Sequence, residues 1–480
     1  MSKKYDELYK RWLDKPMSRR ELLDSARKLG LGGVSAAFLL NTMGTRALAA
    51  TSDFNWKAHK GKTVRLLLNK HPYADTLINN IENFKQLTGM DVQYDIFPED
   101  VYFDKVTSAL QSQSSQYDVF MTGAYQTWQY GPAGWLVDVK QFLNDPQHTA
   151  DTFNWDDVLP NLRASDSWSG QIGDPVGSAN AKQWAMPLGF EQYSLSYNKA
   201  MLDKAGITPP QNLPDLLDKA KAAKDKISGA YGIGVRGSRS WATIHPGYLS
   251  GYTNYGAKDF VMADGKLKSA VNSKASKEFT KLWIEMVKQA GPPDWTTYTW
   301  YEVANDLGAG TSAMIYDADI IGFFQNQGTK QAGNIGYQAF VPNPEASEPT
   351  SNVWIWSLAM SNFSADKPAA WYFLQWATGS QILLKGATEG QLVDPVRQSV
   401  AQDSGFKDRM NSDFPGYLEA FNKTADKAKI YFTPQPLFFN ATTQWAAQLQ
   451  KMYSGQINVD EGLDQLAQNI DQQLKNAGIA

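Results

Sequence analysis

The sequence predicts an α/β fold in which a parallel sheet is covered by helices, and it predicts two domains or lobes. From about residue 63 to residue 121, apolar runs and amphipathic stretches alternate in the order strand, helix, strand, helix, strand. This order is typical of a parallel sheet with right-handed crossovers. The length of 480 residues exceeds what a single hydrophobic core normally supports, which indicates two lobes.

Each of the opening elements has its own signal. Residues 63–68 form a short apolar run, and residues 77–87 place apolar side chains on one helical face before a stop at Gly89. The next elements are a strand at 91–96, a helix at 101–113 and a strand at 117–121. Ligands bind beyond the carboxyl ends of such strands. Residues 69–71 and 122–126 follow two of these ends.

The rest of the chain adds further elements without an internal repeat. We expect an extended segment at 186–199, a helix at 199–205, a strand at 231–235, a hairpin turn at Asp264-Gly265, and amphipathic helices at 279–290 and 459–476.

Two arginines near the start, Arg19 and Arg20, precede a glycine-rich apolar stretch at about 29–44 and the small-residue sequence Ala47-Leu48-Ala49. Together they resemble a twin-arginine export signal. We therefore expect an export signal over residues 1–49, cleavage near Ala49, a periplasmic location, and the twin-arginine translocase as a partner during export. An ordinary secretory peptide remains the alternative.

Composition excludes several classes of function. The net charge of −3 and the lack of a basic stripe argue against nucleic-acid binding. The chain has no cysteine, so it has no disulfide, thiolate metal site or lipidated cysteine. The four histidines are scattered, and no metal or cofactor motif is present. With no second long apolar segment, we expect a soluble, monomeric mature protein without a cofactor.

The order of several weak motifs resembles the family 1 extracellular solute-binding proteins, which serve ABC importers. The most characteristic segment is Ser194-Leu195-Ser196-Tyr197-Asn198-Lys199, with Gly206 and Pro209-Pro210 after it. Other matching segments lie at 87–92, 117–120, 134–139, 310–315 and 366–374. The resemblance covers nearly all of the mature chain.

That resemblance implies a two-lobed periplasmic-binding-protein fold of type II, with the ligand in a cleft between lobes joined by crossing hinge segments. Lobe 1 would comprise residues 60–188 and 343–382, and lobe 2 residues 191–340 and 383–480. The implied partners are a carbohydrate ligand and the permease subunits of the importer. Aromatic side chains, of which the chain has 16 Trp, 22 Tyr and 22 Phe, can stack on sugar rings.

The resemblance also places ligand contacts on both lobes. On lobe 1, His71 follows the first strand, and Tyr125 and Gln126 follow the third. Glu191, at the hinge, would bind ligand hydroxyls through its carboxylate or would form a hinge salt bridge. Trp241 would stack on the ligand or pack in the core.

Four further residues complete the predicted ligand site. Asp317 falls where the family often has a polar contact. Trp354 and Trp356 alternate on one strand and so share a face, where they line the cleft or pack against a helix. Arg397 resembles a family P-x-R element and would contact the ligand or anchor the hinge. No residue is predicted to be catalytic or to bind a metal.

Two other functions remain open at this stage. The same fold could bind a polyamine or another non-sugar solute, since Glu191, Asp317 and Asp319 could supply acidic groups. A secreted glycoside hydrolase needs two carboxylates flanking one bond, for which Glu191 and Asp317 are the candidates.

Overall fold

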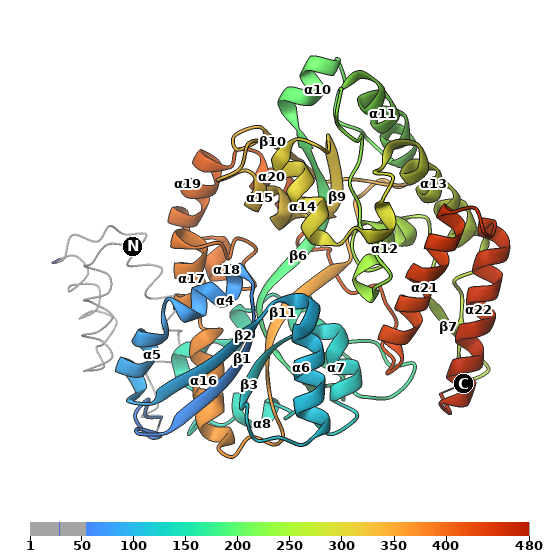
Figure 1. Ribbon diagram of the computed structural model, residues 1–480. Helices are drawn as coiled ribbons and strands as arrows, with labels where there is room; N and C mark the ends of the chain where they lie inside the picture. The colour runs from blue at the N-terminus through green and yellow to red at the C-terminus, as the bar shows by residue number, and fades with distance from the viewer. Residues whose placement is uncertain (1–27, 29–53, 480) are drawn as a thin grey trace. The chain divides into compact units, whose positions relative to one another are not determined.

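The computed structural model describes residue 28 and residues 54–479 (Figure 1). The predicted export signal, with Arg19, Arg20 and the cleavage site at Ala49, lies outside these residues. The chain forms two compact units, each made of segments that are separate in the sequence. Unit 1 contains the described residues up to Ser167, Lys182–Phe190 and Ile355–Arg409, and unit 2 contains Trp168–Ala181, Glu191–Trp354 and the residues from Met410.

The sheet of unit 1 has the strand order β2-β1-β3-β11. Its strands are β1 (Thr63–Asn69), β2 (Asp91–Phe97), β3 (Val119–Gly123) and the part of β11 (Val353–Met360) from Ile355 onward. β1 pairs in parallel with both β2 and β3, and β11 pairs antiparallel to β3 with Trp356 opposite Gly123. The carboxyl ends of β1 and β3 therefore lie at the same edge of the sheet.

The helices of unit 1 include α6 and α16, which both pack against β1 (Figure 1). They are α4 (Pro72–Ile78), α5 (Ile81–Thr88), α6 (Glu99–Gln111), α7 (Ala124–Tyr130), α8 (Lys140–Leu143), α9 (Pro160–Ser165), α16 (Lys367–Ala377), α17 (Ser380–Glu389) and α18 (Gln398–Ala401). α19 (Ser404–Asp413) begins in unit 1 and ends in unit 2.

Unit 2 is built on the second half of β6 (Met186–Asn198), which pairs antiparallel with β9 (Met314–Ala318) and β10 (Ile335–Gln338). A separate hairpin joins β7 (Phe260–Ala263) to β8 (Lys266–Ser269). Its turn has Asp264 and Gly265 at φ values of 51° and 74°. The hairpin predicted at Asp264-Gly265 is therefore confirmed.

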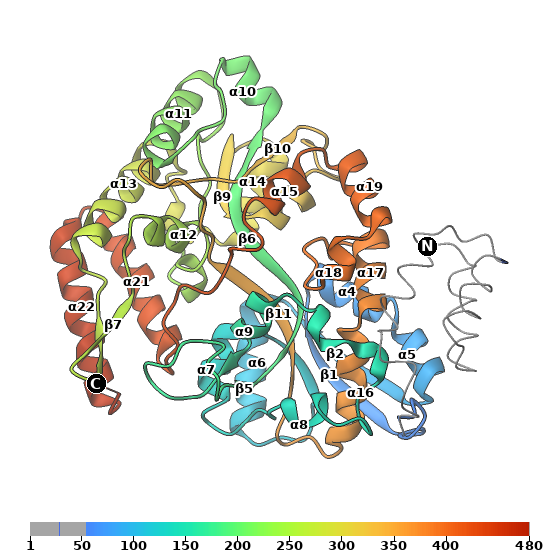
Figure 2. The same ribbon diagram turned by 180° about the vertical axis from the view of Figure 1, so that it is seen from behind.

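The helices of unit 2 include α13, α21 and α22, which pack against one another (Figures 1 and 2). They are α10 (Lys199–Ala205), α11 (Leu213–Lys226), α12 (Gly247–Asn254), α13 (Lys274–Ala290), α14 (Trp300–Ala309), α15 (Asp319–Gln325), α20 (Tyr417–Asn422), α21 (Phe438–Tyr453) and α22 (Val459–Asn476). Among the residues described, no helix is both long and apolar enough to cross a membrane.

One predicted helix is interrupted in the structure. The apolar face expected over residues 77–87 is divided between α4 and α5, which are separated at Asn79 and Asn80. The Asn80 side chain donates to the Thr76 carbonyl at 2.8 Å. Asparagine side chains compete in this way for backbone partners, which ends the first helix and starts a second. Gly89 ends α5 at φ 69°, as predicted.

The strand predicted at 231–235 is wrong. This segment forms only isolated bridges, between Tyr231 and Ser312 and between Gly234 and Ile315. A Cβ at Gly232 would lie 1.9 Å from the Ala220 carbonyl oxygen of α11. Glycine at this position therefore lets the backbone pass close to helix α11, and the segment is not a hydrogen-bonded strand of a sheet.

Residues 383–409 cluster with unit 1, whereas the sequence analysis placed them in lobe 2. The reason is packing of α17 on α4, where Gly386 meets the Thr76 side chain so closely that a Cβ there would lie 2.7 Å from it. Residues 168–181 and 343–354, which were expected in lobe 1, cluster with unit 2. The lobe boundaries themselves stay a prediction.

Candidate functional site

Polar side chains gather at the carboxyl edge of the unit 1 sheet. Asn69 is the last residue of β1, and Gln126 lies in the first turn of α7, directly after β3. Both side chains are 1% exposed. Within the described part of the chain, neither amide group has a hydrogen-bond partner. Burying an amide without a hydrogen-bond partner costs about 1–3 kcal/mol of stability. The amides of Asn69 and Gln126 can therefore still accept and donate hydrogen bonds at this edge of the sheet.

His71, two residues beyond β1, is held in one orientation. Its Nδ1 accepts a hydrogen bond from the Tyr73 backbone N–H at 3.2 Å and so caps α4. Burial lowers the pKa of His71 to about 3. The imidazole is therefore neutral near pH 7, and since Nδ1 accepts, Nε2 carries the proton and is a donor.

Aromatic rings surround His71 in unit 1. The ring of Trp356 lies 4.9 Å from the His71 ring and 6.0 Å from the Phe103 ring, with the latter pair stacked at 12°. Tyr125 is 1% exposed, and its ring lies 5.2 Å from Trp128. The structure thus brings His71 and Trp356 together, and it packs Tyr125 against a helix neighbour.

In unit 2, five rings form what we call the aromatic cluster. Trp241, in the 3₁₀ turn Trp241–Thr243, lies 5.2 Å from Trp354 and 5.3 Å from His245, on which it stacks at 25°. Phe439 stands edge-on to Trp241 at 5.3 Å, and Phe438 lies at 6.4 Å. Trp241 and Phe439 are only partly buried, whereas Trp354 is 3% exposed.

An ion pair lies in the same unit. Arg236 donates through Nε and Nη2 to the two carboxylate oxygens of Asp317 at 3.0 and 2.7 Å, and both residues are buried. Burial tends to lower the pKa of Arg236, but the charge of Asp317 and its hydrogen bonds, with smaller contributions from Tyr193 and Glu191, raise that pKa above its ordinary value. Glu191 therefore lies within electrostatic reach of Arg236.

His245 links this ion pair to the aromatic cluster. Arg236 Nη1 lies 3.4 Å from His245 Nε2, and His245 Nδ1 lies 2.5 Å from the Tyr193 hydroxyl. Burial, and secondarily the positive charge of Arg236, hold the pKa of His245 well below its ordinary value. Because a guanidinium can only donate, Nε2 accepts and the proton lies on Nδ1.

Arg397 is 0% exposed and ties together three segments of unit 1. It donates to the carbonyls of Thr378 and Asn154 at 2.8 and 2.9 Å and to the Asp157 carboxylate at 3.3 Å. Its guanidinium also lies 4.8 Å from the Phe153 ring. These contacts favour the anchoring role over ligand contact.

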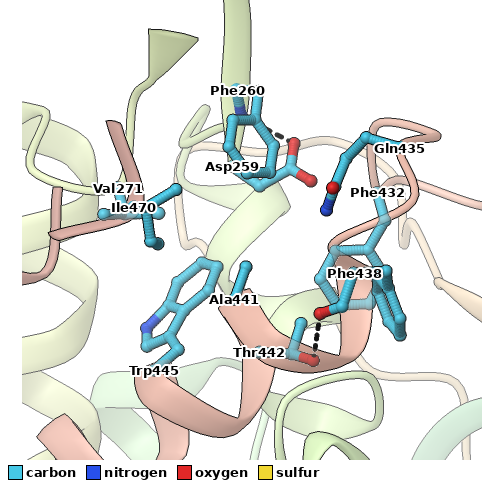
Figure 3. A pocket seen from close by; sticks show the side chains of 10 residues that line it. All are labelled: Asp259, Phe260, Val271, Phe432, Gln435, Phe438, Ala441, Thr442, Trp445 and Ile470. Carbon is cyan, nitrogen blue, oxygen red and sulfur yellow. Dashed lines mark hydrogen bonds between the residues drawn. The ribbon is translucent and has the colours of Figure 1, made fainter. Parts of the chain in front are cut away.

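A small cavity adjoins the aromatic cluster through Phe438 (Figure 3). Its volume of about 10 Å³ has room for a single water and not for a larger solute. Burial raises the pKa of Asp259, one of its lining residues, to about 6. That carboxylate accepts from the backbone and hydroxyl of Thr433 at 2.8 Å, so it fastens the loop before α21.

Sequence reasoning missed Arg236 and His245. It placed Asn69 in the segment 69–71 at a ligand-binding end of the sheet but did not name it among the ligand contacts. The partner of Arg236 lies 81 residues away, and no spacing rule connects the two. Asn69 did carry a signal, since it is a polar residue directly after a buried strand. Among the described residues, no group of three or more His, Cys, Asp or Glu side chains is arranged to hold a metal ion.

Comparison with known proteins decides the family. The sequence model of the family described as bacterial extracellular solute-binding protein matches residues 70–382. This chain belongs to that family. The solute-binding protein is 39% identical over 456 residues to the erythritol/L-threitol-binding protein of Mycolicibacterium smegmatis. The aligned region covers 92% of this chain and 94% of the relative.

Solved structures agree with the family assignment. A solute-binding protein from Agrobacterium vitis with bound D-mannitol has a TM-score of 0.70 at 22% identity, covering 87% of this chain and 99% of that one. One from Agrobacterium radiobacter with ribitol has a TM-score of 0.71 at 19% identity, covering 86% and 99%. The predicted fold, that of the periplasmic solute-binding proteins, is thereby confirmed.

Proposed function

We propose that this chain is the exported substrate-binding component of an ABC importer and that it binds an uncharged carbohydrate, in the first instance a short polyol. The aromatic cluster of unit 2 carries the proposal, because the partly exposed rings of Trp241 and Phe439 suit the C–H surface of a sugar or polyol chain. The relative of M. smegmatis, named for erythritol and L-threitol, supports the polyol class.

The charges of unit 2 favour an uncharged solute over a polyamine. Asp317 gives both carboxylate oxygens to Arg236. Asp319 accepts from the backbone N–H groups of Gln192 and Ile320. The Asp317 carboxylate, with both oxygens paired to Arg236, offers little to an ammonium group. No reaction is proposed, since the Arg236–Asp317 pair also removes the carboxylate that a hydrolase would need.

A thermal-shift screen of the protein without residues 1–49 tests the function. Erythritol, threitol, ribitol and mannitol are compared with spermidine and with uronic acids. A solute at about 100 times its Kd adds roughly 2.7 kcal/mol of stability. We expect a shift with one or more neutral polyols and none with spermidine. A shift with spermidine alone would overturn the carbohydrate assignment, and release of product from aryl glycosides would overturn the non-enzymatic one.

Trp241→Ala should weaken binding of the best polyol at least tenfold, about 1.4 kcal/mol, because it removes the stacking face while Trp354 and His245 stay in place. Isothermal titration calorimetry measures the change. The matched control is Trp135→Ala, which removes a partly buried tryptophan that packs on Tyr130 in unit 1. Equal affinities of the Trp241 variant and the unaltered protein would remove Trp241 from the site.

The same proposal includes export of the protein from the cytoplasm by the twin-arginine translocase. Replacing Arg19 and Arg20 by lysine should leave precursor inside the cell, as cell fractionation would show. Unchanged export of that variant would indicate the general secretory route.

A further inference from the structure

Asn69 and Gln126 occupy an unusual position for buried amides. Asn69 ends β1, and Gln126 lies in the first turn of α7, directly after β3. β1 and β3 form a parallel pair whose register joins Leu66 to Val119 and Leu67 to Phe120. Continuing that register brings the end of β1 beside Thr122, close to where α7 begins. Neighbouring strands are about 4.8 Å apart. Both residues thus lie at the carboxyl edge of one sheet, where ligands bind in α/β folds.

The same unit contains a buried asparagine that shows the ordinary arrangement. Asn80 is 6% exposed, donates to the Thr76 carbonyl at 2.8 Å and accepts from Asn83 at 3.3 Å. Its polar atoms are satisfied by the protein. Neither polar atom of the Asn69 or Gln126 side chain is satisfied by any described residue. Most buried polar groups have partners, so two amides without any at one edge of a sheet call for an explanation.

We propose that Asn69 and Gln126 form a hydroxyl-binding pair that selects an uncharged solute with neighbouring hydroxyl groups. This inference rests on the proposed function and adds that unit 1 binds the solute through its neighbouring hydroxyl groups. An amide offers both donors and an acceptor, and so does a hydroxyl, so each amide both gives and receives a hydrogen bond from the same solute.

Charged groups do not match this pair. A carboxylate only accepts and would leave both amide oxygens unsatisfied, and an ammonium only donates and would leave the amide N–H groups unsatisfied. His71, neutral and with Nε2–H as its donor, adds no charge to this edge. Removing the hydroxyls of the solute also leaves the amides unpaired, which a site built for hydrogen bonds rejects strongly.

Replacing Asn69 and Gln126 by apolar residues of similar shape separates a binding role from a structural one. A binding role predicts weaker affinity without a loss of stability, which a structural role does not. Asn69→Leu and Gln126→Met remove polar groups that the solute-free protein leaves unsatisfied, so its melting temperature should stay the same or rise. Affinity for erythritol should fall roughly 10- to 100-fold in each variant, since the solute's hydroxyls lose their partners. The control Asn80→Leu should lower the melting temperature and leave the affinity unchanged.

Calorimetry with erythritol and with butane-1,4-diol, which lacks the two inner hydroxyls, completes the experiment. We expect the unaltered protein to bind erythritol far better than the diol, and the two variants to lose much of that preference. Variants that bind erythritol as tightly as the unaltered protein, or that melt lower as Asn80→Leu does, would overturn the pair. If the unaltered protein binds neither erythritol nor any other neutral polyol, the proposed function itself fails, which is a separate result.

Discussion

Replacing Arg236 by methionine will lower the free energy of unfolding by about 3–5 kcal/mol, because it leaves the Asp317 carboxylate buried without its counter-ion. Asp317 is 1% exposed, and the nearby Glu191 is 7% exposed. Water therefore cannot easily take over the role of the guanidinium. Urea-induced unfolding followed by tryptophan fluorescence at pH 7 measures the loss.

Two further variants make the interpretation specific. Arg236→Met combined with Asp317→Asn removes the uncompensated charge and should recover a large part of the loss. Arg163→Met removes one member of a pair whose partner, Asp156, is 91% exposed, and should cost less than about 1 kcal/mol. If Arg236→Met costs no more than Arg163→Met, the ion pair does not stabilise unit 2 in the way its geometry indicates.

Asp166→Asn will stabilise the protein at pH 8 and have little effect at pH 4. Asp166 is fully buried in unit 1 and accepts a hydrogen bond from the Ser357 hydroxyl. Burial raises its pKa to about 7, although the Ser357 hydrogen bond works in the opposite direction. In the unfolded chain an aspartate loses its proton near pH 4.

The direction of the pH effect follows from proton counting. Between about pH 4 and pH 7 the folded protein keeps a proton on Asp166 that the unfolded chain has released, so raising the pH in this window favours unfolding. Asparagine at this position cannot ionise. The stability of the variant relative to the unaltered protein should therefore grow by up to roughly 4 kcal/mol from pH 4 to pH 8.

Chemical denaturation at both pH values gives this difference directly. Asp104→Asn is the control, because it removes one carboxylate from an exposed position on α6 in the same unit. Its effect should be small and nearly independent of pH. A constant difference between Asp166→Asn and the unaltered protein across the pH range would show that Asp166 ionises normally.

Local sequence signals predicted much of the fold. Residues 199–205 and 459–476 coincide with α10 and α22. α22 has strong apolar periodicity, with Leu463, Leu466, Ile470 and Leu474 buried on one face. α10 was recognised by its end, where Gly206 adopts the left-handed conformation. The failures are equally informative. At Asn79 and Asn80 a side-chain hydrogen bond overrides periodicity, and at 231–235 glycines serve a close approach that no local pattern reveals.

The candidate site was less accessible to sequence reasoning. The rings of Trp241 and Trp354 lie 5.2 Å apart although the two residues are 113 positions apart in the sequence. The resemblance to the family pointed to Trp241, and the alternation of Trp354 with Trp356 on one strand pointed to Trp354. Asp317 was predicted as a polar contact to the ligand and stays a prediction, and its ion pair with Arg236 depends on tertiary packing that the sequence does not reveal. Whether a side chain such as Arg397 anchors the fold or contacts a solute depends on which carbonyls surround it, and sequence does not contain that information.

The discontinuous make-up of unit 1 has a consequence for the order in which the protein is made. Its sheet needs β11, and its last segment ends at Arg409 of a chain of 480 residues. While the ribosome is still synthesising the middle of the chain, β3 has no neighbour on its outer side, and an unpaired strand edge invites association with other chains. Unit 1 can be completed only near the end of translation, so a holding chaperone would have most of the synthesis time in which to act.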